Sequence, residues 1–275
     1  MTVLALALGA SLAWGVADFV GPWQARALGT MRVLLWAQIG GLAAIGLVVA
    51  IRAHPPHDWA VLLAIPAALS GMLGLYAYYA GAAAGALSVV APIAGASAIV
   101  PVVFGIATGD RPSTLQLAGI GCALLGVVLA SVEHHEGERR MAAGVGLAVL
   151  AAIGFGFYFP PMHAAGEADP WWSSLVFRAT ATVLVVATVW LRRPAIRVGG
   201  WKVWVVLGVG LGDTLGNLLF AAASGHGLVS LTSVLASLYP IVTIVLAAAI
   251  LHERVARSQQ LGIALTLAGV GLIST

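Results

Sequence analysis

Two acidic residues and one basic residue stand inside long apolar segments, where a charged side chain needs a chemical or structural reason. They are Asp18, Arg178 and Asp213. A charge at the centre of a bilayer costs about 2.5–3.5 kcal/mol on insertion scales, so each of these residues is expected to face the interior of a helix bundle. Burial disfavours the charged form of a carboxylate, whereas a nearby arginine favours it. An aspartate under both influences could load and release a proton.

Each of these charges has a functional and a structural interpretation. Asp213 is the stronger candidate for a solute pathway, because Asn217 follows four residues later on the same helix face. The alternative is that Asp213 only pairs with Arg178. Arg178 could itself bind a solute carboxylate, although pairing is favoured because intramembrane charges usually pair. Asp18 either lines the pathway or is a solvated acid at the membrane interface, because Gly21-Pro22 follows closely.

The composition explains how such charges come to be embedded. The 275 residues are 61% hydrophobic and 8% charged, whereas a soluble domain carries about 25% charged residues. A soluble surface built from this sequence would be mostly apolar, so lipid is the expected solvent. The basic residues behind the formal net charge of +3 are scattered over short connections and form no patch for nucleic acid. The single cysteine, Cys122, excludes an internal disulfide framework and a metal site built from cysteines.

Ten apolar segments, each long enough or nearly long enough to cross a bilayer, run along the chain. The stretch from Met1 to Val20 belongs to the first of them and is interpreted as a span, because it lacks the basic start of a signal peptide. The polar run at 133–141 divides five segments from five. The predicted spans are 2–22, 31–51, 59–81, 86–107, 114–131, 142–160, 171–191, 201–223, 228–251 and 258–274.

Basic residues are distributed unevenly over the nine connections between these spans. The odd-numbered connections hold ten of them, and the even-numbered connections hold only Arg52 and Arg111. Cytoplasmic loops carry the excess of Lys and Arg. The count therefore predicts that the odd connections are cytoplasmic and that both termini face outward.

The two halves of the chain align on each other with an offset of 143 residues. Gly109-Asp110-Arg111 falls on His252-Glu253-Arg254, and Gln116, Gly119 and Gly126 fall on Gln259, Gly262 and Gly269. An odd number of spans per half makes the second half enter from the opposite side, so the repeat is inverted. The expected fold is an all-α integral membrane protein with two five-helix inverted repeats at 1–132 and 142–275. Inverted repeats are typical of transporters, whose site lies near the bilayer midplane between the repeats.

With Trp14-Gly15 in the first predicted span and Pro240 ahead of Glu253-Arg254, the repeated residues make the chain resemble the EamA-type, ten-helix members of the drug/metabolite transporter superfamily. The resemblance covers essentially the whole chain, and it implies a transporter of small metabolites or drugs, often an exporter. Relatives are commonly drawn with both termini in the cytoplasm, which conflicts with the count of basic residues. The first half departs from the pattern, with Ser97 in place of the second half's proline and Asp110 where the family usually has Glu. The matching features are Trp14-Gly15, Asp110-Arg111, Gln116, Gly119, Gly126, Pro240, Glu253-Arg254, Gln259, Gly262 and Gly269.

Aromatic residues lie in the helices that the resemblance assigns to the cavity lining. Rings with a polar tip suit an amphipathic or aromatic solute, although packing against lipid or helices is the simpler explanation for any single ring. Five tryptophans at predicted span starts are interpreted as interface anchors and left out of the site. The aromatic candidates for the substrate pathway are Trp14, Tyr78, Tyr79, Phe155, Tyr158 and Tyr239.

Two further patterns concern packing and motion. Prolines can act as hinges of transport or as static kinks, and small residues at helical spacing allow close helix packing. That packing is expected within the chain by default, and a homodimer face is the alternative. The prolines are Pro92, Pro101, Pro160, Pro161 and Pro240, and the small residues are Gly119, Ala123, Gly126, Gly262, Thr266 and Gly269.

The hypothesis from the sequence is a secondary transporter that moves a small metabolite or amphipathic solute by alternating access. Export is expected, either linked to protons or facilitated without them, in a multi-pass protein of a cell membrane, most simply the inner membrane of a bacterium. The alternatives are an intramembrane enzyme and a channel. No cofactor is expected, because the sequence has no P-loop and no catalytic constellation inside a span. No metal is expected either, because His134 and His135 belong to the polar linker.

Overall fold

The computed structural model describes residues 2–83, 94, 96–131, 141–250 and 256–274, and every regular element in these ranges is helical. A chain surrounded by lipid must satisfy its backbone hydrogen bonds internally, and helices do this within one segment. The elements are α1 (Thr2–Leu28), α2 (Thr30–Arg52), η1 (Trp59–Leu63), α3 (Ala64–Ala83), η2 (Ala96–Ala98), α5 (Ile99–Thr108), α6 (Thr114–Ser131), α7 (Met141–Ala168), α8 (Pro170–Arg192), α9 (Lys202–Ser224), α10 (Val229–Ala236), α11 (Tyr239–Ile250) and α12 (Arg257–Ile273).

Within the described ranges, seven helical segments are long and apolar enough to cross a membrane. Each of the ten predicted spans contains helix, so the all-helical class is confirmed, while the count of ten spans stays a prediction. Ala96–Thr108 and Thr114–Ala130 are apolar but shorter than the other seven. The first part of the fourth predicted span and residues 133–140 of the polar linker lie outside the described residues.

Two helices run further than the sequence predicted. The first span was expected to end at residue 22, but α1 continues through Pro22 to Leu28. The sixth was expected to end at residue 160, but α7 continues through Pro160 and Pro161 to Ala168. Membrane helices tolerate proline because neighbouring groups re-satisfy the freed carbonyl oxygen. The extension of α1 places Asp18 ten residues before the helix end.

The ninth predicted span, 228–251, is matched by an apolar segment at Val229–Ile250, but the helix is interrupted within it. α10 ends at Ala236 and α11 begins at Tyr239. Pro240 has no N–H group to donate to the carbonyl oxygen of Ala236, so the helical ladder is interrupted there. The Ser237 hydroxyl donates to the carbonyl oxygen of Val234 at 2.9 Å and satisfies one of the last carbonyl groups of α10. Pro240 therefore accounts for the break between α10 and α11.

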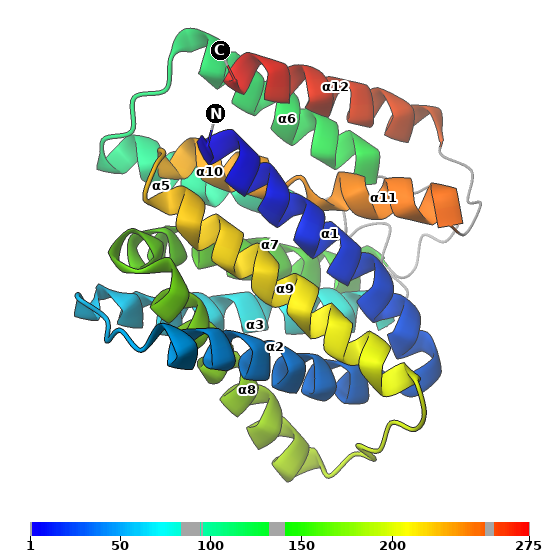
Figure 1. Ribbon diagram of the computed structural model, residues 1–275. Coiled ribbons are helices and arrows are strands. Elements are labelled where there is room, and N and C mark those ends of the chain that lie inside the picture. Colours follow the sequence, from blue (N-terminus) through cyan, green and yellow to red (C-terminus); the bar gives the residue numbers. More distant parts are fainter. Residues whose placement is uncertain (1, 84–93, 95, 132–140, 251–255, 275) are drawn as a thin grey trace.

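Three helix pairs organise the bundle: α6 packs against α12, α3 against α7, and α1 against α9. Figure 1 shows α6 and α12 side by side, and α1 and α9 running obliquely across the view. A methyl group added at Gly126 would lie 2.6 Å from the carbonyl oxygen of Gly262, and one at Gly119 would lie 2.7 Å from that of Gly269. The small-residue interface therefore joins α6 to α12 within one chain, as the default interpretation expected.

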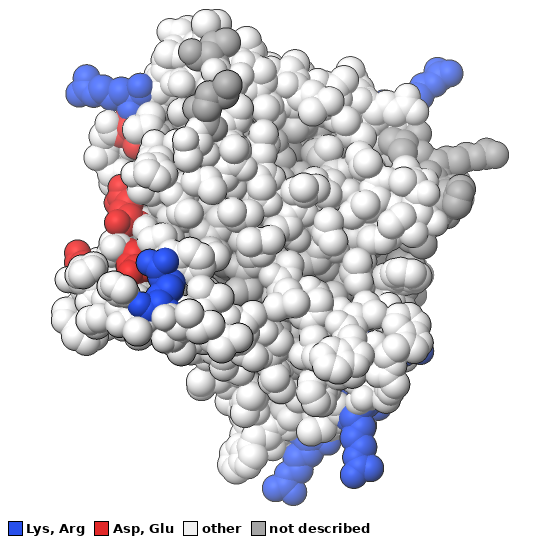
Figure 2. Space-filling model, in the orientation of Figure 1, with Lys and Arg blue, Asp and Glu red and all other residues white. Residues whose placement is uncertain are grey.

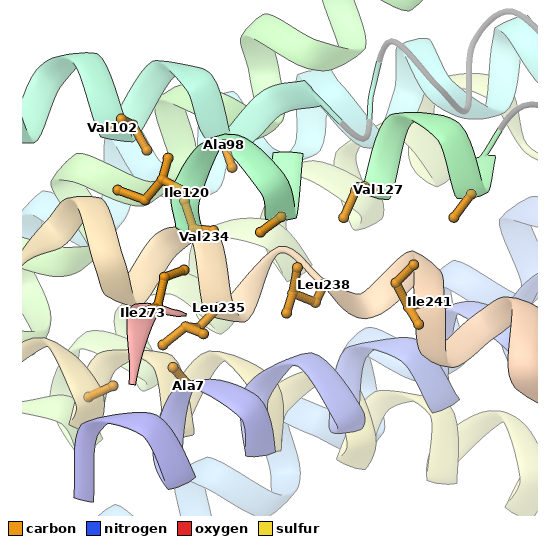
Figure 3. Close-up of a cluster of buried hydrophobic side chains, with 13 residues drawn as sticks. Ala7, Ala98, Val102, Ile120, Val127, Val234, Leu235, Leu238, Ile241 and Ile273 are labelled. Carbon is orange, nitrogen blue, oxygen red and sulfur yellow. The ribbon is translucent and has the colours of Figure 1, made fainter. Parts of the chain in front are cut away.

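A hydrophobic cluster links the two halves on the side of the α6–α12 pair. Figure 3 shows side chains from α1, α5, α6, α10, α11 and α12 converging, among them Val102, Val127 and Val234. Val127 and Val234 are almost completely buried. This cluster fixes α10 against α5 and α6. A second cluster surrounds Trp14 and is part of the site described below.

Apart from Asp18, Arg178 and Asp213, the charged side chains that the structure describes lie at or near the ends of the helices or in the connections. Figure 2 shows a broad uncharged face with charged side chains only at its margins. The described acids outside the helix interiors all belong to even-numbered connections: Asp58, Asp110, Glu167 and Asp169. Asp58 and Asp169 accept hydrogen bonds from the first backbone N–H groups of η1 and α8. The uncharged face is the surface expected to contact lipid.

Candidate functional site

A buried ion pair joins three helices at the centre of the site. The Nη2 atom of Arg178, on α8, lies 2.6 Å from Oδ2 of Asp213, on α9. The Nη1 atom of Arg178 donates a hydrogen bond to Oε1 of Gln38, on α2, at 2.8 Å. Arg178 is 1% exposed and the Asp213 side chain is 38% exposed. The structure therefore has the Arg178–Asp213 pairing that the sequence favoured, and it adds Gln38, which the sequence analysis missed.

Glycines allow α2 and α9 to approach closely enough for this pair to form. A methyl group added at Gly210 would collide with the carbonyl group of Ala37, and one at Gly41 would collide with the Thr214 hydroxyl group. Any larger residue at either position would push the two helices apart. The separation between α2 and α9 sets whether Gln38 and Asp213 can both reach Arg178.

A second polar link connects α7 to α9. The Tyr158 hydroxyl group donates to Oδ1 of Asn217 at 2.7 Å, and both residues are buried. The Nδ2 group of Asn217 donates to the backbone carbonyl oxygen of Asp213 at 2.8 Å. Asn217 is thus held by both neighbours, which fixes the orientation of its amide and leaves Tyr158 as part of the cavity wall.

A cavity of about 130 Å³ lies beside these groups, between helices of both halves. It brings together most of the residues that the sequence proposed and adds six others. The predicted residues that line it are Trp14, Asp18, Phe155, Tyr158, Asp213, Asn217 and Tyr239, and the additional ones are Gln38, Gly71, Met72, Leu75, Phe159 and Phe177.

Three predicted residues do not line this cavity. Arg178 lies behind Asp213 and contributes through the ion pair. The ring of Tyr78 lies 6.3 Å from that of Phe155, so it supports the wall from outside. Tyr79 belongs to α3, and its side chain lies outside the described residues.

Asp18 occupies a different environment from Asp213. It is exposed, lines the cavity, and lies one helical turn after Trp14 on α1. Among the residues that the structure describes, Asp18 has neither a hydrogen-bond partner nor a basic partner. It lies within α1, ten residues before the end of that helix at Leu28.

The wall of the cavity is largely aromatic, with Trp14 at its centre. The ring centroid of Trp14 lies 5.8 Å from that of Tyr158 and 6.3 Å from that of Tyr239, both edge-on. Phe159 and Phe220 pack against Trp14 from the side of α7 and α9. Edge-on rings at these separations are favourable pairs. The wall therefore presents ring surface and carboxylate oxygen to the same small space.

A larger hollow, of about 360 Å³, lies at the ends of α2 and α8. Its lining includes His54 and Trp172, but none of the embedded charges. Trp172 donates from its indole N–H group to the carbonyl oxygen of His54 at 2.8 Å, as an interface anchor does. The smaller central cavity, which has the convergent polar groups, is therefore the candidate site.

No group of three His, Cys, Asp or Glu side chains is placed to hold a metal ion in the part of the chain that the structure describes. The predicted exclusion of His134 and His135 from a metal site concerns residues outside that part. The central cavity offers ionic, hydrogen-bonding and ring contacts. Such a set can bind a solute and hold a proton.

Comparison with known proteins identifies relatives at two levels. The family described as "EamA-like transporter family" matches residues 1–132 and 142–275. No curated protein matches the sequence significantly. A solved structure, described as "Crystal structure of protein", is similar with a TM-score of 0.81 and 16% sequence identity, over 98% of this chain and 95% of that one. At this identity the likeness establishes a shared fold.

Proposed function

The chain belongs to the EamA-like transporter family, and we propose that it moves a small solute through the central cavity by alternating access. As a member of this family it is a multi-pass membrane protein and a transporter of the drug/metabolite type. The observation that carries the proposal is the central cavity, because it gathers Asp18, Asp213 and an aromatic wall between helices of both halves. Intramembrane charges that face a cavity mark substrate and ion pathways.

Helix pairing supports an inverted repeat with halves at 1–132 and 142–275, joined by the linker at 133–141. In this repeat the counterparts are α1 and α7, α2 and α8, α3 and α9, and α6 and α12. When the halves are exchanged, the pair α1–α9 becomes the pair α7–α3, and both of these pairs pack together. The pairing of α2 with α9 likewise becomes that of α8 with α3, which also pack together. The pairs α6–α12 and α2–α8 each exchange into themselves.

The small-residue interface supports the same proposal at the level of single residues. Gly119 meets Gly269, and Gly126 meets Gly262. The sequence repeat places Gly119 on Gly262 and Gly126 on Gly269. The two contacts therefore map onto each other when the halves are exchanged, as expected for an antiparallel pair on a two-fold axis. Inverted repeats of this kind support alternating access around a fixed site.

One contact between the halves would have to break if this end of the molecule opens. Oδ2 of Asp110, in the α5–α6 connection, accepts a hydrogen bond from the backbone N–H group of Ser230 at 2.8 Å. Ser230 belongs to the first turn of α10, so the carboxylate also meets the positive end of that helix. We propose that this contact helps to close the end of the bundle that bears the even-numbered connections.

We further propose a coupling ion and a direction of transport, and both proposals are based on the embedded acids. Asp213 is paired with Arg178, whereas Asp18 has no partner among the described residues. A proton on Asp18 would therefore remove an uncompensated charge, which favours Asp18 over Asp213 as the site of proton exchange. Coupling to an inward proton gradient would drive export, in a cell membrane such as the inner membrane of a bacterium.

The test is a flux assay in proteoliposomes with a panel of small metabolites, with and without a pH gradient. We expect at least one solute to move, faster with the gradient, and Asp18→Asn to abolish the effect of the gradient. Glu167→Gln, a change of the same kind at a surface carboxylate that is 58% exposed, is the matched control. The transport proposal is wrong if no solute moves through well-folded protein, and the proton proposal is wrong if Asp18→Asn responds to the gradient as the unmodified chain does.

A further inference from the structure

The charges around the central cavity do not balance. Two carboxylates, Asp18 and Asp213, line it, and one guanidinium group lies behind it. Arg178 binds Asp213 and Gln38 and is 1% exposed, so a solute in the cavity does not reach it. One negative charge therefore remains when both acids are ionised. An uncompensated charge inside a bundle is unfavourable, and a bound cation would compensate it.

The polar lining favours a cation over an anion. The amide of Asn217 is engaged by Tyr158 and by the backbone of Asp213, so it offers little to a solute. Asp18 is exposed to the cavity without a partner among the described residues, and the Asp213 side chain is 38% exposed. An ionised carboxylate can accept hydrogen bonds but cannot donate one. An ammonium group would supply the missing donors, whereas a solute carboxylate would meet like charge.

The aromatic wall favours the same ligand. Trp14 lies one turn before Asp18 and is flanked by Tyr158 and Tyr239. The negative face of an aromatic ring attracts a cation, most strongly in a desolvated site. The same rings would pack against the apolar body of the solute. At about 130 Å³ the cavity is smaller than the 300–1,000 Å³ or so of drug-sized sites, which restricts that body to about one ring.

We propose that the central cavity binds a small protonated amine with an apolar or aromatic body, its ammonium group beside Asp18 and its body against Trp14 and Tyr239. This inference rests on the proposed transport function, since it names the class of solute. It assigns the carboxylate of Asp18 to recognition of charge and the rings to recognition of shape. Asp213 and Arg178 hold the site in place.

The test compares three probes of matched shape by calorimetry on the purified full chain at neutral pH: phenethylammonium, 2-phenylethanol and phenylacetate. We expect the cation to bind about tenfold more tightly than the neutral alcohol, which is about 1.4 kcal/mol, because its ammonium group donates charge-assisted hydrogen bonds to the carboxylate. Phenylacetate should bind most weakly. Asp18→Asn should lower the affinity for phenethylammonium about tenfold and leave that for 2-phenylethanol unchanged, which also shows that the variant is folded. Glu167→Gln should change neither affinity.

Equal binding of the three probes, or tighter binding of phenylacetate or of zwitterionic phenylalanine, would overturn the inference. So would an unchanged cation affinity in Asp18→Asn. A flux assay with phenethylammonium separates this result from the transport proposal. Selective binding without flux of this or any other solute supports the cation site and contradicts the transport function. Flux of other solutes without cation selectivity supports transport and contradicts this inference.

Discussion

Tyr158 and Asn217 form a buried hydrogen bond whose contribution can be isolated. Removing the Tyr158 hydroxyl group leaves Oδ1 of Asn217 without its donor, and interhelical hydrogen bonds in membranes contribute about 0.6 kcal/mol on average, with larger values for buried groups. We expect Tyr158→Phe to lower the free energy of unfolding in detergent by about 1 kcal/mol. Tyr76→Phe is the control, because Tyr76 is 55% exposed on the same bundle. Equal effects of the two substitutions would show that the bond contributes nothing specific.

The two cavity aspartates should differ in what they do for stability. Asp213→Asn leaves the buried guanidinium group of Arg178 without its counter-charge, whereas Asp18→Asn removes a charge that has no partner among the described residues. Breaking a fully buried pair costs about 3–5 kcal/mol, and the partial exposure of Asp213 reduces this to about 2 kcal/mol. We expect Asp213→Asn to unfold at lower denaturant concentration than the unmodified chain. Asp18→Asn should be neutral or stabilising.

The reverse order of stability, with Asp18→Asn the weaker protein, would contradict this assignment of roles. It would mean that Asp18 is stabilised by a contact outside the described part of the chain. Arg178→Met in the Asp213→Asn background tests the same point. Replacing both partners by uncharged groups should restore stability lost in Asp213→Asn alone.

The charged residues of the site could be predicted from the sequence, whereas its neutral polar residue and the arrangement of its rings could not. A lone charge in an apolar segment stands out in any sequence, which is why Asp18, Arg178 and Asp213 could be found. Gln38 is neutral and occurs in a segment otherwise suited to lipid, so its role depends on a distant arginine 140 residues away. Which aromatic rings line the cavity depends on helix rotation, and this separates Phe155, on the wall, from Tyr78, behind it.

At the scale of the elements, the α6–α12 interface depends on glycines, whose lack of a side chain lets the two backbones come into contact. A methyl group at Gly126 would lie 2.6 Å from the carbonyl oxygen of Gly262 and closer still to the backbone N–H group of Thr266. Overpacking of this kind typically costs about 1–3 kcal/mol. We expect Gly126→Ala to lower the unfolding free energy in detergent by an amount in that range.

Gly121→Ala is the matched control on the same helix, because nothing lies within 4 Å of the position its methyl group would take. It should be neutral. If Gly126→Ala and Gly121→Ala behave alike, α6 and α12 are not in close contact in the membrane. A larger effect of Gly121→Ala would instead place an interface on the opposite face of α6.

Helix positions were easier to predict than helix ends. Apolar length located each helical segment, because the bilayer sets the number of residues needed to cross it. The same criterion misplaced the ends of α1 and α7, since Pro22, Pro160 and Pro161 stand within continuous helix. At Pro240 the chain breaks instead. Whether a proline bends, breaks or merely occupies a helix depends on the neighbours that satisfy the freed carbonyl group, and these neighbours come from other helices.

At the scale of the whole molecule, charge is segregated between the two ends of the bundle, and this predicts its orientation. If successive spans alternate in direction, the described bases of the odd-numbered connections lie at one end of the bundle, and the described acids lie at the other with Arg52 and Arg111. Figure 2 shows the acids gathered at one margin of the molecule. The residues on the basic end are Arg32, Arg192, Arg193, Arg197, Lys202 and Arg257. Since cytoplasmic loops carry the excess of Lys and Arg, we predict that the basic end is cytoplasmic and that both termini face outward.

Single cysteines in a Cys122→Ala background decide this orientation. His57→Cys places a thiol in the exposed α2–η1 connection, and Gly199→Cys places one in the exposed α8–α9 connection, where nothing lies within 4 Å of the new side chain. A membrane-impermeant maleimide added to intact cells should label His57→Cys at once and Gly199→Cys only after permeabilisation, while the cysteine-free background stays unlabelled. The opposite pattern would put both termini in the cytoplasm, as relatives are commonly drawn. The acidic end, with Asp110 against Ser230, would then face the cytoplasm, and the proposed closing contact would act on the inner side.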